Sequence, residues 1–293
     1  MLINKRIIVG AIAVYLILPV IVPVVSTENE IKYIPSLIYD ADSMEYWAVL
    51  VGIGDYPGVT SDLPYSINEI MSFKDTLLDG GNWNESNIHV LTDNDATKAN
   101  IFNELEWLNS NADKNDISIF YYAGHGVQSS NNEYLAVYDE LISDEELDEE
   151  LDNFESRITV ILDACHSGGF IEEVGKRGRV ILTACRKDEE TYQVFELRSG
   201  IFGYFINISL EKLTKTAETT FLFTWFFSVY YSKQLSQYYE GDYTIHPRMY
   251  DGCLGMTRII DHHQYVQTFL YKMFPSIIEN SNVNNINNRT WKM

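Results

Sequence analysis

The chain has 293 residues, enough for one large α/β domain or two small ones, and its 46% hydrophobic and 22% charged residues are ordinary for a globular protein. Its 21 Lys and Arg against 42 Asp and Glu give a net charge of −21. This balance argues against a nucleic-acid partner, because phosphate contacts need clustered basic side chains. It suits a basic substrate or bound Ca²⁺, and solubility alone would also account for it.

Residues 1–26 are predicted to be a signal peptide or a membrane anchor. Lys5 and Arg6 precede an apolar run at 7–25, and a basic flank before such a run is typical of both. The run is nearly long enough to span a bilayer, and a cleavage site before Thr27 is equally compatible with its sequence. Both alternatives place the rest of the chain outside the cytoplasm, secreted or membrane-anchored.

The folded domain is expected to span 45–262, after a linker or short pro-segment at 27–44. Apolar runs predict strands, some buried on both faces, and helical spacing predicts amphipathic helices between them. This alternation predicts an α/β fold with a mostly parallel central sheet and helices on both faces. Residues 263–293 are expected to form a C-terminal helix and an Asn-rich, disordered tail. The predicted strands are 46–53, 88–91, 117–122, 134–138, 158–162, 180–184 and 256–260; the predicted helices are 67–78, 97–109, 144–154, 201–213 and 221–239; and loops are expected at 127–132 and 172–179.

Two predicted strands end abruptly at a reactive side chain followed by glycine. The strand at 117–122 leads into His125, within the sequence Tyr-Ala-Gly-His-Gly, and the strand at 158–162 leads into Cys165, within Asp-Ala-Cys-His-Ser-Gly-Gly. Ligands of parallel sheets bind outside the carboxyl ends of the strands. The two residues are therefore expected at one edge, which is the layout that a cysteine nucleophile and its base need.

A thiol attacks a carbonyl group only as the thiolate, and a histidine is suited to shuttle the proton. His125 is the better candidate for the base, because His166 would point to the opposite face of an extended strand from its neighbour Cys165. The backbone N–H groups of Gly126 and Cys165 are candidates for an oxyanion hole. A zinc site at Cys165 and His166 lacks the usual spacing of ligand pairs, so no metal ligand is assigned.

These two motifs resemble the paired catalytic motifs of the caspase and metacaspase peptidases. The Cys-His-Ser-Gly-Gly form is closer to metacaspases than to animal caspases. The resemblance extends from about Tyr46 to Ile260 and implies the caspase-like three-layer fold with a His125/Cys165 dyad. It also implies an endopeptidase that forms a thioester acyl-enzyme.

The resemblance further implies a pocket for a basic P1 side chain. Asp163, two positions before the nucleophile, and Glu69 match acidic pocket residues of metacaspases, with Glu69 in place of the usual Asp. Ser66 stands where the family often has Cys, and Ala123 where it often has Ser. Cleavage after Arg or Lys is therefore expected. The alternative for Asp163 is a buried acid bonded to backbone N–H groups.

Three further features leave alternatives open. Outside the cytoplasm, Cys185 and Cys253 suit a disulfide, but three free thiols are equally compatible. The basic run at 176–179 is expected to be an exposed loop, either an ordinary turn or a self-processing site. No cofactor is required, although Ca²⁺ remains an option because some metacaspases need it. Its candidate ligands are Asp139, Glu140, Asp144, Glu145 and Asp148, which lack EF-hand spacing.

The sequence therefore favours a cysteine endopeptidase acting on proteins or peptides. A catalytically silent caspase-fold scaffold is one alternative, although a scaffold has no need of an intact His and Cys pair. A transpeptidase with the same dyad is another, because the acyl-enzyme chemistry is shared and only the acceptor differs.

Overall fold

The computed structural model describes residues 44–58, 62–130, 132–253, 255–261 and 290–293. The expected signal or anchor at 1–26 and the linker lie outside these ranges, as does most of the expected tail. Within the described ranges, no helix is both long enough and apolar enough to cross a membrane.

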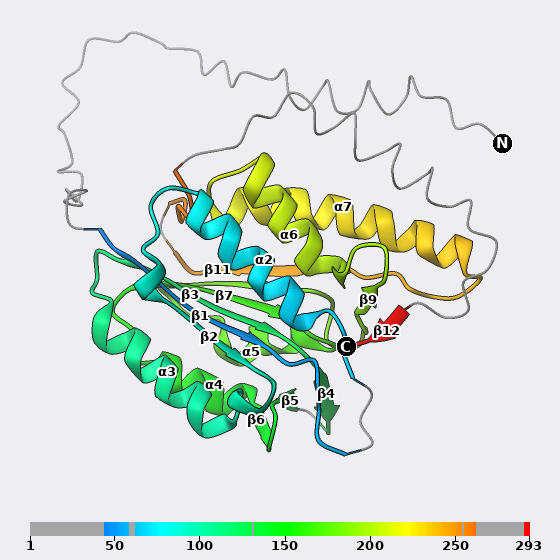
Figure 1. Cartoon of the computed structure of the whole chain (residues 1–293), viewed down its shortest axis with the longest axis horizontal. Helices are drawn as coiled ribbons and strands as arrows, with labels where there is room; N and C mark the ends of the chain where they lie inside the picture. The colour runs from blue at the N-terminus through cyan, green and yellow to red at the C-terminus, as the bar shows by residue number, and fades with distance from the viewer. Residues whose placement is uncertain (1–43, 59–61, 131, 254, 262–289) are drawn as a thin grey trace, which may run out of the picture. The chain divides into compact units, whose positions relative to one another are not determined.

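A six-stranded sheet forms the centre of the domain (Figure 1). Five of its strands are parallel, and the strand at one edge pairs antiparallel with its neighbour. The prediction of a mostly parallel α/β sheet is confirmed. In spatial order the strands are β11 (Arg248–Asp251), β8 (Arg179–Thr183), β7 (Arg157–Asp163), β3 (Ile117–Ala123), β1 (Tyr46–Gly52) and β2 (Ile88–Thr92).

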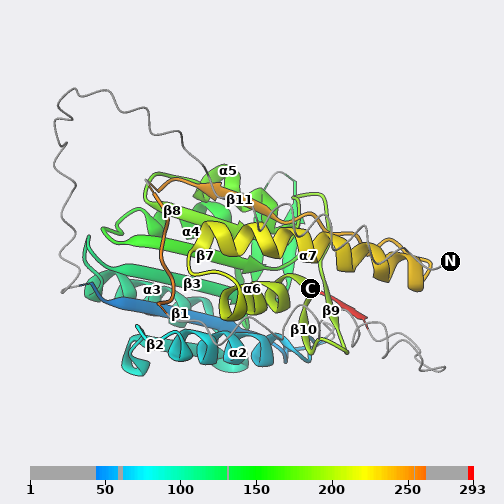
Figure 2. The ribbon, with the colours of Figure 1, turned by 90° about the horizontal axis from the view of Figure 1, so that it is seen from above.

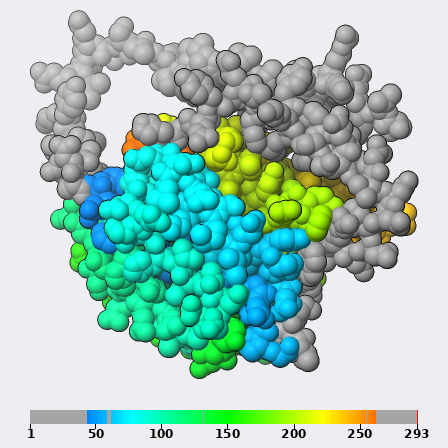
Figure 3. Space-filling model, in the orientation of Figure 1, coloured from blue at the N-terminus to red at the C-terminus, as the bar shows by residue number. Residues whose placement is uncertain are grey.

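Helices cover both faces of the sheet, as predicted (Figures 1 and 2). One face carries α2 (Ser66–Asp79), α6 (Ile201–Lys212) and α7 (Ala217–Tyr238), and the other carries α3 (Lys98–Asn111), α4 (Asp144–Leu151) and α5 (Ile171–Val174). In the space-filling view, α2 lies beside α6 on the surface (Figure 3). Short 3₁₀ turns occur as η1 (Glu85–Asn87), η2 (Asp93–Asp95) and η3 (Ser167–Phe170).

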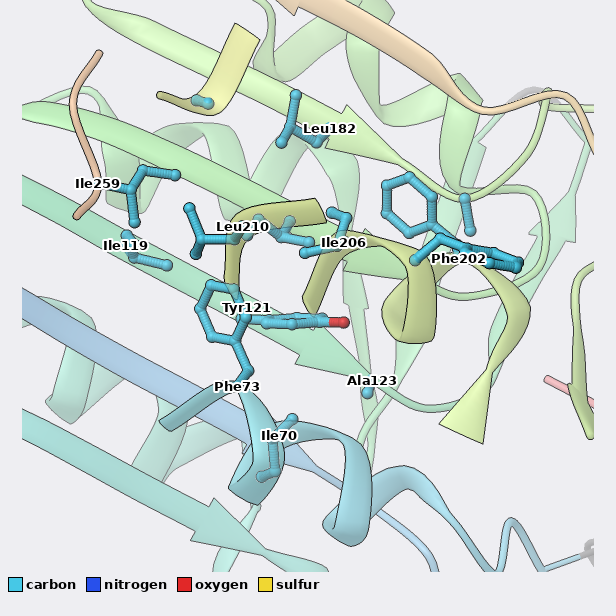
Figure 4. Packing of buried hydrophobic residues seen from close by; sticks show 14 of the residues in the cluster. Ile70, Phe73, Ile119, Tyr121, Ala123, Leu182, Phe202, Ile206, Leu210 and Ile259 are labelled. Atoms are coloured by element: carbon cyan, nitrogen blue, oxygen red, sulfur yellow. The ribbon is translucent and has the colours of Figure 1, made fainter. Parts of the chain in front are cut away.

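The central strand β3 explains why both faces need cover. All seven of its residues are buried, and their side chains alternate between the two hydrophobic clusters. On the α2 and α6 face, the ring of Tyr121 packs edge-on against Phe73 at 5.0 Å, beside Ile206 and Leu210 (Figure 4). Burying side chains of this size contributes roughly 1.5–3 kcal/mol each, so this packing fixes the strand that leads to His125.

Two small sheets lie beyond the predicted core. One contains β4 (Gly126–Ser129), β5 (Asn132–Ala136) and β6 (Leu141–Ser143). The expected loop at 127–132 is thus wrong in part, because β4 and β5 form a hairpin. The other contains β10 (Ser199–Gly200), β9 (Tyr192–Val194) and β12 (Thr290–Lys292). β12 belongs to a segment that was expected to be a disordered tail.

The strand predicted at 256–260 is wrong. The β pairing of this segment is limited to one isolated bridge between Arg258 and Thr216. The N–H groups of Ile259 and Ile260 both donate to the carbonyl of Lys215. This segment therefore binds at the start of α7 instead of extending the sheet, and β11 forms the edge strand.

The basic run at 176–179 is only partly exposed, which corrects the expectation for Arg179. Its side chain is 4% exposed and binds Asp148 at 2.6 Å and Asp152 at 2.8 Å. Lys176 binds the same two carboxylates at 2.6 and 2.9 Å. We call these four residues the ion cluster; it anchors the start of β8 to α4. The expected loop at 172–179 is also shortened, because α5 continues to Val174.

Candidate active site

The strands β3 and β7 bring His125 and Cys165 to the same edge of the sheet. They are parallel neighbours, with Ala123 opposite Asp163 at their ends. His125 and Cys165 each lie two residues beyond these positions. The N–H of Gly124 donates to the carbonyl of Asp163 at 3.2 Å, which continues the pairing past the strands. Both side chains therefore start from the carboxyl edge, where such sheets bind ligands.

The backbones beside the two residues make a close contact. A Cβ atom placed on Gly126 would lie 2.0 Å from the carbonyl oxygen of Cys165. Only glycine fits here without a shift of the backbone. The contact joins the two residues whose N–H groups are the candidates for an oxyanion hole.

Three hydrogen bonds fix the backbone of His125. Its N–H donates to the Tyr56 hydroxyl at 2.8 Å, and its carbonyl accepts from the Ala136 N–H at 2.9 Å and the Tyr122 hydroxyl at 3.0 Å. The Tyr56 ring packs on the half-buried imidazole, with 4.7 Å between ring centroids. Burial raises the pKa of both phenols, so the hydroxyls stay neutral near pH 7. The backbone position of His125 thus depends on the Tyr56 and Tyr122 hydroxyls, which do not titrate near pH 7.

The thiol of Cys165 is covered by the backbone of Thr191. The Thr191 N–H donates to Sγ at 3.4 Å, and Sγ lies 3.7 Å from the Thr191 carbonyl oxygen. Cys165 is only 1% exposed. The next residue, His166, has a left-handed backbone (φ 61°), and its ring Nδ1 lies 2.9 Å from the carbonyl of Lys187. The imidazole of His166 is therefore bound to the segment before Thr191.

Glu69, in the first turn of α2, is buried against Ser199 and Gly200, which precede α6. Its Oε1 accepts a hydrogen bond from the Tyr121 hydroxyl at 2.8 Å, and its Oε2 accepts from the Ser199 hydroxyl at 2.7 Å and the Gly200 N–H at 2.6 Å. Burial raises the pKa of this carboxyl despite the three donors. A cavity of about 100 Å³ between α2 and α6 borders Glu69, and neither His125 nor Cys165 lines it.

Asp163 is fully buried next to Glu69, and we call the two residues the acid pair. Its Oδ2 accepts from the Gly203 N–H at 2.8 Å, whereas its Oδ1 accepts no hydrogen bond within the described residues. Burial, followed by repulsion from Glu69, raises the pKa of Asp163 well above its usual range. Oδ2 therefore fits the alternative of a buried structural acid, and Oδ1 is an acceptor that is itself buried.

Ser66 does not bond to the acid pair. It is fully buried, and its hydroxyl accepts a hydrogen bond from Gln193 Nε2 at 2.9 Å. Gln193 Oε1 accepts from the Tyr65 N–H at 3.0 Å. Ser66 thus connects the start of α2 to β9 through Gln193.

Three residues of this site were not predicted as functional: Tyr56, Thr191 and Gln193. Tyr56 lies in a sequence that indicates only a turn, and its partner Tyr122 is 66 residues away. Gln193 and Thr191 follow an irregular polar stretch. A Gln that is buried in a strand must find hydrogen-bond partners for its side-chain amide, and such a residue is a candidate for a structural or functional role. The sequence alone does not show that Gln193 is buried, so this signal could not be used.

The acids proposed as Ca²⁺ ligands do not converge. Asp148 belongs to the ion cluster, and Asp139 accepts a hydrogen bond from the Lys98 N–H at 2.9 Å. In the described part of the chain, no three His, Cys, Asp or Glu side chains are placed to hold a metal ion. Cys165, Cys185 and Cys253 form no disulfide with one another in the described part of the chain.

A mostly parallel sheet with helices on both faces, and a His and a Cys at the ends of neighbouring strands, defines the class of caspase-like folds. The chain belongs to the caspase domain family, whose model matches residues 45–245. The predicted resemblance is confirmed.

Among curated relatives, Metacaspase-4 of Arabidopsis thaliana is 31% identical in an alignment of 175 residues that covers 54% of this chain and 41% of the relative. Metacaspase-1 of Schizosaccharomyces pombe is 28% identical over 147 residues, 43% of this chain and 34% of the relative. The matched stretch spans less than half of either relative.

Among solved structures, protein GSU0716 from Geobacter sulfurreducens superposes with a TM-score of 0.56 at 12% identity. The superposition covers 76% of this chain and 98% of that protein. At this identity the likeness concerns the fold alone.

Proposed function

We propose that this protein is a cysteine endopeptidase in which Cys165 is the nucleophile and His125 is the general base. The observation that carries the proposal is the close contact of Gly126 with Cys165, at the joint edge of β3 and β7. His125 is the residue before Gly126, so it lies next to the residue that contacts the Cys165 backbone. Membership of the caspase domain family supports the same assignment.

In the acylation step, His125 accepts the thiol proton and the Cys165 thiolate attacks the scissile carbonyl carbon. The carbonyl oxygen becomes an oxyanion, which the N–H groups of Gly126 and Cys165 stabilise; one such donor contributes about 3–4 kcal/mol. The C–N bond then breaks, and the amine leaves with the proton held by His125. The product is a thioester on Sγ.

In the deacylation step, His125 takes a proton from water, and the hydroxide attacks the thioester carbonyl. The C–S bond breaks, and the thiolate recovers the proton. An amine that entered in place of water would give the transpeptidase product, so the acceptor alone distinguishes the two activities.

Cleavage after Arg or Lys is the specificity that the acid pair supports. Glu69 and Asp163 are buried side by side, and no basic side chain binds either carboxyl within the described residues. Asp163 Oδ1 in addition lacks any donor there. A guanidinium or ammonium group would supply both the positive charge and the donor.

The test is hydrolysis of otherwise identical peptides with Arg, Lys, Asp or Asn at P1. We expect cleavage of the Arg and Lys peptides, loss of activity in Cys165→Ala and in His125→Ala, and unchanged activity in the control Cys253→Ala. Mass analysis of the products separates hydrolysis from transfer. A preference for Asp would contradict the specificity, and full activity of Cys165→Ala would contradict the mechanism.

The proposed site of action is outside the cytoplasm, with the chain secreted or anchored through residues 1–26. The support is the basic flank and apolar run at the start of the sequence. Fractionation of cells that produce the full chain, with and without residues 1–26, tests this. Recovery of both forms in the cytoplasm would contradict it.

A further inference from the structure

The strand β12 of this chain lies along the strand that borders the thiol. It pairs antiparallel with β9, with Thr290 opposite Val194, Trp291 opposite Gln193 and Lys292 opposite Tyr192. The N–H of residue 293 then donates to the carbonyl of Thr191 at 3.1 Å, which extends the ladder by one step. Residues 290–293 therefore lie as an extended peptide on the edge of β9.

This ladder ends beside the nucleophile. The Thr191 carbonyl that accepts from the Met293 N–H is the same oxygen that lies 3.7 Å from Cys165 Sγ, and the Thr191 N–H donates to that sulfur. Met293 is 1% exposed and belongs to the same hydrophobic cluster as Cys165 and Tyr56. The peptide thus runs up to Thr191, the residue that borders the Cys165 thiol, and the Met293 side chain is buried in the hydrophobic cluster on that face of the sheet.

The edge of β9 is suited to hold a peptide by its backbone. β10 covers the other edge of β9, so β12 fills the edge that would otherwise present unpaired N–H and C=O groups. Gln193 fixes β9 to α2 through Tyr65 and Ser66. A rigid, open strand edge binds extended peptides by main-chain hydrogen bonds, a recognition mode that tolerates many sequences.

We propose that residues 290–293 occupy the peptide-binding edge of β9 and act as an intramolecular inhibitor that shields Cys165. This inference rests on the proposed function, because it treats the edge of β9 as the place where a substrate backbone binds. A substrate carbonyl must come within about 3–3.5 Å of Sγ to react. Cys165 is 1% exposed beneath the backbone of Thr191, and residue 293 is hydrogen-bonded to that same backbone. The segment must therefore release Thr191 before a substrate carbonyl can reach Sγ.

The test compares the full chain with a chain that ends at Arg289. The first readout is the rate at which a small alkylating reagent labels Cys165, measured by mass spectrometry of its peptide. The second is hydrolysis of a P1 Arg peptide. A tethered segment acts at an effective concentration of order mM, so its removal is expected to raise the labelling rate and lower KM by about tenfold or more, with kcat unchanged.

Two further arms separate inhibition from damage to the fold. A free peptide with the sequence Thr-Trp-Lys-Met, added to the shortened chain, is expected to raise KM competitively and to slow labelling. Met293→Ala in the full chain is expected to speed labelling, whereas its matched control Met256→Ala, at a position 61% exposed and outside the ladder, is expected to have no effect.

The outcomes distinguish this inference from the proposed function. Faster labelling without peptidase activity in either chain would retain the shielding segment and reject the peptidase. Peptidase activity with identical KM and identical labelling in both chains would reject the inhibitor and retain the peptidase. A shortened chain that labels faster but ignores the free peptide would also overturn the inference, because binding at the β9 edge would then not be the cause.

Discussion

The acid pair and the ion cluster contain the same kinds of acidic residue in opposite electrostatic states. Glu69 and Asp163 are buried with hydroxyl and N–H donors only, and burial raises the pKa of both. In the ion cluster, a hydrogen bond from Lys176 lowers the pKa of Asp152, and Arg179 binds beside it. Neutral donors do not compensate a buried carboxylate for its lost hydration, whereas cations do.

This difference suggests opposite roles for the two sites. The ion cluster already has its positive charges and holds α4 to the start of β8. The acid pair lacks a cationic partner within the described residues, and its member Asp163 lies two residues before the proposed nucleophile. It therefore gains most from a cation that arrives with a substrate. Four changes test this comparison, in order of decreasing expected effect.

The largest effect is expected for Arg179→Ala in the ion cluster. Arg179 is 4% exposed, and its loss removes the buried one of the two cations that bind Asp148 at 2.6 Å. Breaking a buried pair from one side costs about 3–5 kcal/mol. Urea unfolding measures this as a lower free energy of unfolding. A loss below about 1 kcal/mol would show that the cluster behaves like a surface ion pair.

The second effect is expected for Asp163→Asn, which keeps the shape of the side chain and removes its charge. A charge-assisted hydrogen bond is worth about 1.5–3 kcal/mol, so kcat/KM for a P1 Arg peptide should fall roughly 10- to 150-fold. The raised pKa of Asp163 means that its carboxyl costs stability at pH 7, so the free energy of unfolding there should rise in Asp163→Asn. Equal kcat/KM values for the two proteins would remove Asp163 from the P1 pocket.

The third effect is a change in the pH dependence of stability in Glu69→Gln. With its pKa raised in the folded state, Glu69 binds more protons when folded than when unfolded. Its stabilising contribution is complete below the unfolded pKa of about 4 and is lost as the pH rises through the folded value. The wild type should therefore lose more stability than Glu69→Gln as the pH rises from 4. Urea unfolding at several pH values gives the change of the free energy of unfolding with pH for the wild type and for Glu69→Gln. The same pH dependence in both proteins would contradict a raised pKa of Glu69.

The smallest effect is expected for Lys176→Ala. Lys176 is half-exposed, so water and salt screen its pairs with Asp148 and Asp152. Its loss should cost about 1 kcal/mol or less, and added salt should reduce the difference. Urea unfolding at low and high ionic strength tests both parts. A loss as large as that of Arg179→Ala would mean that charge, and not burial, sets the strength of this cluster.

The sequence predicts the sheet, its helices and the edge where His125 and Cys165 lie, because these features depend on local patterns of apolar residues. It does not predict the pairing of β12 with β9, since nearly one hundred residues separate the two strands and neither has a distinctive pattern. Arg179 was expected in an exposed loop because a basic run is usually solvated; its burial depends on Asp148, 31 residues earlier.

The side chain of Gln193 has a mechanical consequence for specificity. It joins β9 to Tyr65 and Ser66 at the start of α2, and Glu69 lies in the first turn of that helix. A shift of β9 would break both hydrogen bonds or move α2 with it. The proposed peptide-binding edge of β9 and the proposed P1 carboxylate of Glu69 are therefore joined rigidly, with a fixed spacing between them. A fixed spacing between the β9 edge and the Glu69 carboxylate suits a substrate side chain of one length. A peptide with ornithine at P1, whose side chain is shorter, is therefore expected to bind less tightly than the same peptide with arginine.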